Sequence, residues 1–315
     1  MIDRTSFGPE TTADEVLEGF DLTGKHVLIT GASGGLGAET ARAMAAKGAE
    51  VIVTARNLDK MRGVVKAVKA ATGAELAVEA LELGSFASSR AFAARFLVKY
   101  EKLDILINNA GVMACPQQKT EDGIELHFGS NHLGHFLMTN LLARTLAKGA
   151  RVVALSSAAH VVSPVVFEDI QFEKRAYDKW QAYGQSKTAN ALFAVGLNAR
   201  LKGRGVEAFS VHPGAIMTDL GRHHGEEDLV RTRRAVERGR LTLKTVAAGA
   251  ATSVFAATAP ELAGKGGAYL ADCTISPISA EGGNFTVVRP YALDPTAADR
   301  LWAVSEKMVG QSFDG

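Results

Sequence analysis

The sequence predicts a doubly wound α/β fold, a three-layer sandwich in which helices cover both faces of a mainly parallel sheet of about seven strands. Short runs rich in β-branched residues alternate with longer alanine-rich stretches of helical character. Several of the short runs are apolar at every position, which is typical of strands buried on both faces of a parallel sheet. Regular alternation of strands and helices indicates the same architecture.

The expected elements follow one another along most of the chain. The strands are expected at residues 26–30, 51–55, 76–81, 104–107, 151–155, 206–211 and 268–270. The helices are expected at residues 36–47, 58–71, 88–100, 126–146, 180–202 and 245–258. Because no internal repeat or linker rich in Pro, Gly and Ser interrupts this order, we expect residues 1–315 to form a single domain.

Three segments do not fit the alternation. Residues 1–23 precede the first strand, and we expect them to pack as an N-terminal arm or to stay mobile. Residues 160–179 form an insertion between the fifth strand and the next helix. Residues 219–244 are polar and rich in arginine. They form either a solvated helix face or a flap over a substrate pocket.

Composition and charge exclude several classes of function. The chain has 35 basic and 34 acidic side chains, and this balance predicts no binding to nucleic acid or to an anionic membrane. Its two cysteines, Cys115 and Cys273, form no metal or redox motif, so we expect a reducing compartment, the cytoplasm. The N-terminus lacks a signal-peptide pattern. No apolar run reaches the roughly 18 residues of a membrane span.

A glycine-rich turn follows the first expected strand and leads into a helix. Residues 30–37 read Thr-Gly-Ala-Ser-Gly-Gly-Leu-Gly. In Rossmann-type folds, such a turn lets a pyrophosphate approach the backbone N–H groups at the helix N-terminus. An ordinary strand–helix turn is the alternative, but the position after the first strand favours a dinucleotide. The residues expected to contact it here are Gly31, Ser33, Gly34, Gly35, Leu36 and Gly37.

Arg56 stands at the end of the second expected strand. An acidic residue at this place binds the ribose 2′-hydroxyl of NAD, whereas an arginine accommodates the 2′-phosphate of NADP. No Asp or Glu competes within the strand end, so we expect NADP(H) to be preferred over NAD(H). A surface arginine at a strand end is the alternative.

Two features of the sequence point to proton transfer beside this cofactor. Tyr183 and Lys187 lie four residues apart in an expected helix and so share a face. An ammonium about 4 Å away would stabilise the phenolate by roughly 4 kcal/mol and bring the pKa of the tyrosine near neutrality. A chance occurrence is the alternative, since this spacing is found in many helices. Small polar residues or glycines also follow the fourth, fifth and sixth strands, at the edge where ligands of parallel sheets bind.

The sequence resembles the short-chain dehydrogenase/reductase family from about residue 24 to residue 270. The residues that carry the resemblance are the glycine turn, Asn108-Asn109-Ala110-Gly111, Asn131, Ser157, Tyr183, Lys187, Pro213, Gly214 and Thr218. Residues 130–136, 156–160 and 183–190 are similar in detail to the branch of retinol dehydrogenases and WW-domain oxidoreductases. This resemblance implies the Rossmann-type fold and oxidoreductase activity.

The resemblance also implies roles for individual residues. Tyr183 would be the catalytic acid–base, and Lys187 would lower its pKa and hold the nicotinamide ribose. Ser157 would bind the substrate oxygen, and Asn131 would hold a water in a proton relay. Further residues expected to contact the cofactor are Glu82, Leu83, Asn109, Ala110, Gly111, Pro213, Gly214, Ile216 and Thr218.

The sequence departs from the family pattern at two informative places. Glu82 stands where an aspartate usually touches the adenine, which puts that contact in doubt. Ser157 and Tyr183 are 26 residues apart, about twice the usual separation, and the retinol dehydrogenase branch carries a similar insertion.

The segments after the fourth, fifth and sixth strands should build a mostly apolar substrate pocket. They supply Val112, Met113, Ala114, Cys115, His160, Val161, Val162, Ala215, Ile216 and Met217. We therefore expect a small apolar ketone, aldehyde or alcohol as substrate. We expect no metal, although His127, His132 and His135 lie on one helical segment. His160 either touches the substrate or bonds to backbone.

The sequence predicts an NADP(H)-dependent oxidoreductase that interconverts an apolar carbonyl compound and its alcohol. A nonenzymatic NADP(H)-binding regulator on the same fold is one alternative, which the presence of both Tyr183 and Lys187 disfavours. A sugar-nucleotide epimerase or dehydratase is another, and the chain lacks its large C-terminal substrate domain. The insertion at residues 160–179 borders a helix that commonly pairs across the family's dimer interface, so we expect a monomer or homodimer.

Overall fold

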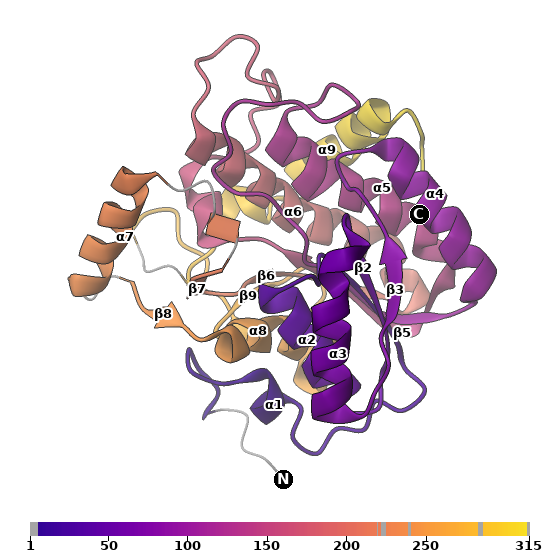
Figure 1. Cartoon of the computed structure of the whole chain (residues 1–315). Coiled ribbons are helices and arrows are strands. Elements are labelled where there is room, and N and C mark those ends of the chain that lie inside the picture. Colours follow the sequence, from indigo (N-terminus) through magenta and orange to yellow (C-terminus); the bar gives the residue numbers. More distant parts are fainter. Residues whose placement is uncertain (1–5, 219, 222–224, 239–240, 283–285, 314–315) are drawn as a thin grey trace.

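A computed structural model of the chain describes residues 6–218, 220–221, 225–238, 241–282 and 286–313. An eight-stranded sheet runs through its centre in the order β10-β9-β6-β5-β4-β1-β2-β3 (Figure 1). Neighbouring strands are parallel except for β10, which is antiparallel to β9. The strands are β1 (His26–Thr30), β2 (Glu50–Ala55), β3 (Ala77–Ala80), β4 (Leu103–Asn108), β5 (Leu146–Leu155), β6 (Glu207–His212), β9 (Tyr269–Ala271) and β10 (Thr274–Ile275). The doubly wound fold expected from the sequence is thus confirmed.

Helices cover both faces of this sheet. They are α1 (Ala13–Val16), α2 (Gly35–Ala45), α3 (Met61–Thr72), α4 (Phe86–Lys99), α5 (Gly134–Leu142), α6 (Lys179–Leu201), α7 (Glu226–Glu237), α8 (Val246–Thr258) and α9 (Pro295–Val309). The helices α1, α2, α3 and α8 pack on one face, and α4, α5, α6 and α9 on the other. A two-stranded sheet of β7 (Ala215–Ile216) and β8 (Leu243–Lys244) lies beside α7, apart from the main sheet (Figure 1).

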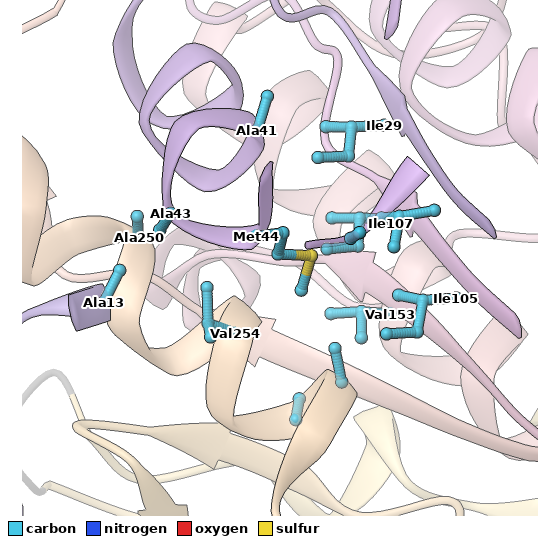
Figure 2. Packing of buried hydrophobic residues seen from close by; sticks show 14 of the residues in the cluster. Ala13, Ile29, Ala41, Ala43, Met44, Ile105, Ile107, Val153, Ala250 and Val254 are labelled. Atoms are coloured by element: carbon cyan, nitrogen blue, oxygen red, sulfur yellow. The ribbon is translucent and has the colours of Figure 1, made fainter. Parts of the chain in front are cut away.

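Alternate residues of the central strands build two separate cores. In β1, Ile29 faces α2 and α8, whereas Leu28 faces the helices on the opposite side. Figure 2 shows the first core, in which Met44 of α2 points toward Val153 of β5, and Val254 of α8 belongs to the same cluster. Because side chains alternate along a strand, the all-apolar runs of the sequence fill both cores at once.

The structure corrects the expected helix over residues 126–146. A π-helical segment, Phe128–Leu133, precedes α5, and α5 ends at Leu142. A short 3₁₀ turn follows, whose Thr145 hydroxyl donates to the Leu142 carbonyl at 2.8 Å. The chain then enters β5 at Leu146, which pairs with Leu103 of β4. This pairing supplies the backbone hydrogen-bond partners that a continued helix would otherwise supply.

The C-terminal helix α9 was not expected from the sequence, although its end signals are present there. Asp294 caps its N-terminus and accepts from the backbone N–H groups of Thr296 and Ala297 at 2.8 and 3.4 Å. Pro295 occupies its first turn, and Gly310 ends it with a φ of 67°. Both are standard helix boundary signals.

The segments set apart in the sequence have distinct places in the fold. Residues 6–23 pack as an arm against α8, with Leu17 fully buried and the ring of Phe7 6.2 Å from that of Phe255. The segment at 219–244 contains α7, while residues 219, 222–224 and 239–240 lie outside the described residues. The assignment of all 315 residues to one domain stays a prediction.

Candidate active site

A cavity of about 930 Å³ opens at the carboxyl ends of β1, β4, β5 and β6. Every residue that the sequence predicts as a cofactor contact lines it, and so do Ser157, Tyr183 and Lys187. This is the edge at which parallel α/β sheets bind ligands. The fold therefore brings together side chains that lie more than 180 residues apart in the sequence.

The glycine turn forms one wall of the cavity, and its shape depends on the absence of side chains. Gly31 has a φ of 68°, and a Cβ atom there would lie 2.7 Å from the Cα of Ala110. At Gly37 a Cβ atom would lie 2.6 Å from the carbonyl oxygen of Gly31. The side chain of Asn109 ties this turn to β4 by donating to the carbonyls of Thr30 and Gly31 at 2.7 and 3.1 Å.

The turn fits a pyrophosphate. Gly34 is the N-cap of α2 and supplies no side-chain acceptor to the first N–H groups of the helix. Gly34 and Gly35 both line the cavity, so an anion could approach these N–H groups without a steric barrier. Thr218 and Ile216 also line the cavity, and Thr218 lies beside the turn, where a Cβ atom on Gly35 would be 3.3 Å from its side chain.

Arg56 and Glu82 lie at the exposed end of the cavity. Their side chains are 63% and 35% exposed, and the Nε of Arg56 is 3.5 Å from a carboxylate oxygen of Glu82. The other oxygen of Glu82 accepts from the backbone N–H of Gly84 at 2.8 Å. The guanidinium that the sequence assigns to a 2′-phosphate thus already has an acidic neighbour.

Tyr183 and Lys187 lie at the buried end, one turn apart on α6. Asp178 fixes the start of this helix by accepting from the N–H groups of Trp180 and Gln181 at 3.0 and 2.7 Å. Both Tyr183 and Lys187 are only 4% exposed. The Nζ of Lys187 donates to the carbonyl of Leu155 at 2.9 Å and lies 5.6 Å from the centre of the Tyr183 ring.

The electrostatics of this pair correct the expectation from the sequence. Burial raises the pKa of Tyr183 to about 12, and a hydrogen bond with Ser157 opposes that shift. Burial also lowers the pKa of Lys187 to about 7. Removing a phenolate or an ammonium from water is costly, so burial shifts both groups toward their neutral forms. None of the residues that the structure describes brings the pKa of Tyr183 near neutrality.

Ser157 and Asn131 differ in their access to the cavity. Ser157 lines it and accepts from the Ala159 N–H at 3.1 Å, which starts the 3₁₀ helix Ala158–Val162. Asn131 does not line it. Its side chain accepts from the Val112 N–H at 2.8 Å and donates to the Val112 carbonyl and to Ser186 at 3.0 and 2.9 Å. Asn131 thus joins the loop after β4 to α6, and its water relay stays a prediction.

The histidines of the expected helix are buried and separately paired. The Nε2 atoms of His132 and His135 lie 2.8 Å from the hydroxyls of Ser305 and Thr30. In the part of the chain that the structure describes, no three His, Cys, Asp or Glu side chains could hold a metal ion together.

His160 bonds to backbone and does not line the cavity, and Ala114 does not line it either. The Nδ1 of His160 is 2.7 Å from the carbonyl oxygen of Ser157, and its Nε2 accepts from the Arg289 N–H at 3.1 Å. The other eight residues expected in the apolar pocket line the cavity: Val112, Met113, Cys115, Val161, Val162, Ala215, Ile216 and Met217.

Sequence patterns missed several residues of the cavity wall. Trp180 and Asp228 line it from α6 and α7. Asp228 accepts from the indole N–H of Trp180 at 3.0 Å and from the Nζ of Lys179 at 2.5 Å, which links α7 to the start of α6. The acidic start of α7 was visible as a helix signal, but nothing in the sequence paired it with α6.

Comparisons with a family model and with known proteins point to the same family. The family model described as short chain dehydrogenase matches residues 25–229. Retinol dehydrogenase 12 of Mus musculus is 42% identical over 299 residues, 93% of this chain and 89% of the relative. Short-chain dehydrogenase/reductase prx1 of Penicillium roqueforti is 40% identical over 312 residues, 96% of this chain and 91% of the relative.

Solved structures show the same fold. An uncharacterised protein from Mycobacterium paratuberculosis superimposes with a TM-score of 0.74 at 34% identity, over 96% of this chain and 99% of that one. A short chain dehydrogenase from Burkholderia cenocepacia in complex with NADP gives a TM-score of 0.63 at 25% identity, over 80% and 97% of the two chains. No helix among the described residues is long and apolar enough to cross a membrane.

Proposed function

The chain belongs to the short-chain dehydrogenase/reductase family, oxidoreductases that act on CH–OH groups, and from this premise we propose that it uses NADP(H) to interconvert an apolar ketone or aldehyde and its alcohol. One observation carries the proposal. Tyr183, Lys187 and Ser157 meet at the buried end of a cavity whose outer wall is a glycine turn and whose inner wall is mostly apolar.

The glycine turn, Arg56 and Asn109 would hold the cofactor, which supplies or accepts the hydride when bound. Tyr183 donates a proton to the substrate oxygen during reduction and takes it back during oxidation. Its raised pKa keeps the phenol protonated at neutral pH, which suits the donor role. Ser157 would bind the same oxygen, and Lys187 would hold the hydroxyls of the nicotinamide ribose.

Arg56 supports the preference for NADP(H) over NAD(H). Its guanidinium lines the cavity and offers a charge-assisted hydrogen bond to a 2′-phosphate. The neighbouring Glu82 competes for the same guanidinium. The Burkholderia cenocepacia structure contains NADP, which is consistent with this choice.

The apolar lining supports a hydrophobic substrate. Met113, Val161 and Met217 line the cavity together with Trp180, and no Lys or Arg except Arg56 and Lys187 is in the described lining. The relatives from Mus musculus and Homo sapiens are named retinol dehydrogenases, and retinol is a long apolar alcohol. We propose long-chain or ring-containing aldehydes and their alcohols as the substrate class.

The C-terminal helix supports a monomer over a homodimer. The ring of Trp302 in α9 lies 4.9 Å from that of Phe136 in α5 and 6.0 Å from that of Phe193 in α6. The resemblance to the family implies that the surfaces of α5 and α6 pair across a dimer interface, and α9 here covers apolar side chains of both helices. Location in the cytoplasm stays a prediction from the sequence.

Turnover of NADPH with a panel of carbonyl compounds tests the proposal. We expect retinal and decanal to be reduced, with NADPH favoured over NADH, and acetaldehyde and pyruvate to be poor substrates. NADPH that binds but is recovered unchanged with every compound would contradict the proposal and favour a nonenzymatic NADP(H)-binding regulator.

A further inference from the structure

A buried group of polar side chains beside the active site has no part in the mechanism above. His127 and Tyr177 bond to the backbone of Cys115 in the loop after β4, and Glu125 bonds to the ring of His127. Glu125 and His127 are almost fully buried, and the ring of His127 lies 6.0 Å from that of Tyr183. Polar groups at such depth need hydrogen-bond partners, and here those partners include the backbone of Cys115.

Both backbone groups of Cys115 are held by side chains from elsewhere. Its N–H donates to the Nε2 of His127 at 3.1 Å, and its carbonyl accepts from the hydroxyl of Tyr177 at 3.0 Å. The preceding residue, Ala114, has a φ of 51°, in the left-handed region that residues with a Cβ atom seldom adopt. A strained turn of this kind persists only where its surroundings hold it in place.

The tautomer of His127 follows from these partners. Its Nε2 accepts from the Cys115 N–H, so the ring proton of the neutral form lies on Nδ1 and donates to a Glu125 oxygen at 2.8 Å. The same oxygen accepts from the backbone N–H of His127 at 3.0 Å, and the other oxygen from that of Phe128 at 2.8 Å. Glu125 therefore orients the imidazole that orients Cys115.

The insertion at residues 160–179 completes this arrangement. Tyr177 comes from the insertion, and so does Gln171, whose side-chain oxygen accepts from the Glu125 N–H at 2.9 Å. The ring of Tyr177 packs 5.2 Å from that of Phe172 in the same segment. The insertion thus supports the loop after β4 at two points, and that loop carries Met113 and Cys115 into the substrate end of the cavity.

We propose that Glu125, His127 and Tyr177 are positioning residues that fix the Met113–Cys115 wall and so set which substrates the pocket accepts. They act through the backbone of Cys115, and none of the three lines the cavity. Their loss should weaken the binding of large apolar substrates, which need the whole wall, more than that of small ones. The kinetic part of this inference rests on the proposed function.

The experiment compares Tyr177→Phe with Thr145→Val. The first removes the hydroxyl on the Cys115 carbonyl and keeps the ring. The second removes another buried bond from a hydroxyl to a backbone carbonyl, from Thr145 to Leu142 at 2.8 Å, and neither of these residues lines the cavity. We expect Tyr177→Phe to raise the KM for retinal about three- to tenfold, as loss of one such bond implies, with smaller changes for hexanal and for NADPH. The kcat should change less than twofold, and Thr145→Val should leave all these values near wild type.

Hydrogen exchange of the ligand-free protein gives a second readout that does not depend on turnover. We expect peptides covering residues 112–118 to exchange faster in Tyr177→Phe, with peptides of α6 unchanged. Equal losses for retinal and hexanal, or unchanged exchange at residues 112–118, would overturn the inference. If no carbonyl compound is reduced by the wild type, the proposed function fails, and exchange alone then decides whether these residues hold the wall.

Discussion

The two ends of the cavity place charged or ionisable groups in opposite surroundings. At the inner end, Tyr183 and Lys187 are 4% exposed, and burial moves the pKa values of both. At the outer end, the side chains of Arg56 and Glu82 are 63% and 35% exposed and 3.5 Å apart. Water and salt screen the outer pair, while the inner pair feels the full cost of burial.

This difference predicts separate roles for the two ends: the inner end determines the rate of the chemical step, and the outer end determines which cofactor is preferred. Replacing the buried phenol of Tyr183 should change the rate of the chemical step, because Tyr183 is the group that we assign to proton transfer. Replacing a residue of the exposed ion pair changes which cofactor is preferred. The size of that change is limited because solvent screens the attraction between the charges. We therefore expect substitutions to have effects that decrease from the inner end to the outer end.

Tyr183→Phe should have the largest effect. It removes the only group that we assign to proton transfer and keeps the ring, so kcat should fall by at least a hundredfold, in line with general acid–base catalysis. Affinity for NADPH, measured by fluorescence titration, should stay within about threefold of wild type. Turnover close to normal in this variant would show that Tyr183 is not the catalytic acid–base. It would also contradict the proposed difference between the two ends of the cavity.

The pH dependence of the two directions is the next largest effect. Oxidation of the alcohol needs Tyr183 without its proton, and burial raises the pKa of Tyr183 to about 12. Between pH 8 and 10, above the pKa of about 7 for Lys187, the competent fraction should rise about tenfold per pH unit. Reduction needs the protonated phenol and should lack this rise. Values of kcat/KM in both directions at one ionic strength check this, and a flat oxidation profile would contradict the raised pKa.

Arg56→Asp should reverse the cofactor preference by a smaller factor. A charge-assisted bond to a 2′-phosphate is worth about 1.5–3 kcal/mol where it is sheltered, but the exposure of Arg56 and its neighbour Glu82 reduce this. We expect wild type to prefer NADPH over NADH about tenfold in kcat/KM and the variant to prefer NADH. Equal use of both cofactors by the wild type would show that Arg56 does not select between them.

Glu82→Gln should have the smallest effect and in the opposite direction. It removes the carboxylate that competes for Arg56 and keeps an oxygen that can accept from the Gly84 N–H. Preference for NADPH should increase about two- to threefold at low salt and less at high salt, because screening weakens the original pair. A decrease in that preference, measured as the ratio of kcat/KM values, would mean that Glu82 supports the 2′-phosphate rather than competing with it.

The sequence predicted the fold and the cavity lining well because both depend on local patterns. Apolar runs such as that of β1 indicate strands that are buried on both faces. Glycines such as Gly31 stand where a side chain would collide with a neighbouring residue, here Ala110 just after β4. The place of Arg56 was also predictable, since the carboxyl ends of parallel strands meet at one edge. Even α9 had its signals in Asp294, Pro295 and Gly310.

Properties that depend on tertiary packing could not be predicted in this way. The spacing of Tyr183 and Lys187 placed them on one face but contained nothing about how deeply α6 is buried, which decides both pKa values. The partner of Arg56 lies at the end of another strand, and Asn131 turned out to bond to Val112 behind the cavity. The bond from Tyr177 to Cys115 joins residues 62 apart, with no motif to mark it.

Transfer of deuterium from C4 of deuterated NADPH to retinal tests directly whether the protein is a reductase that depends on Tyr183. We predict that wild-type protein places deuterium on the carbinol carbon of the product alcohol, as detected by mass spectrometry. Tyr183→Phe should do so at least a hundredfold more slowly, with the label in the same position. Wild-type protein that binds the cofactor but forms no labelled alcohol with any apolar aldehyde, or label transfer at an equal rate in the variant, would contradict it.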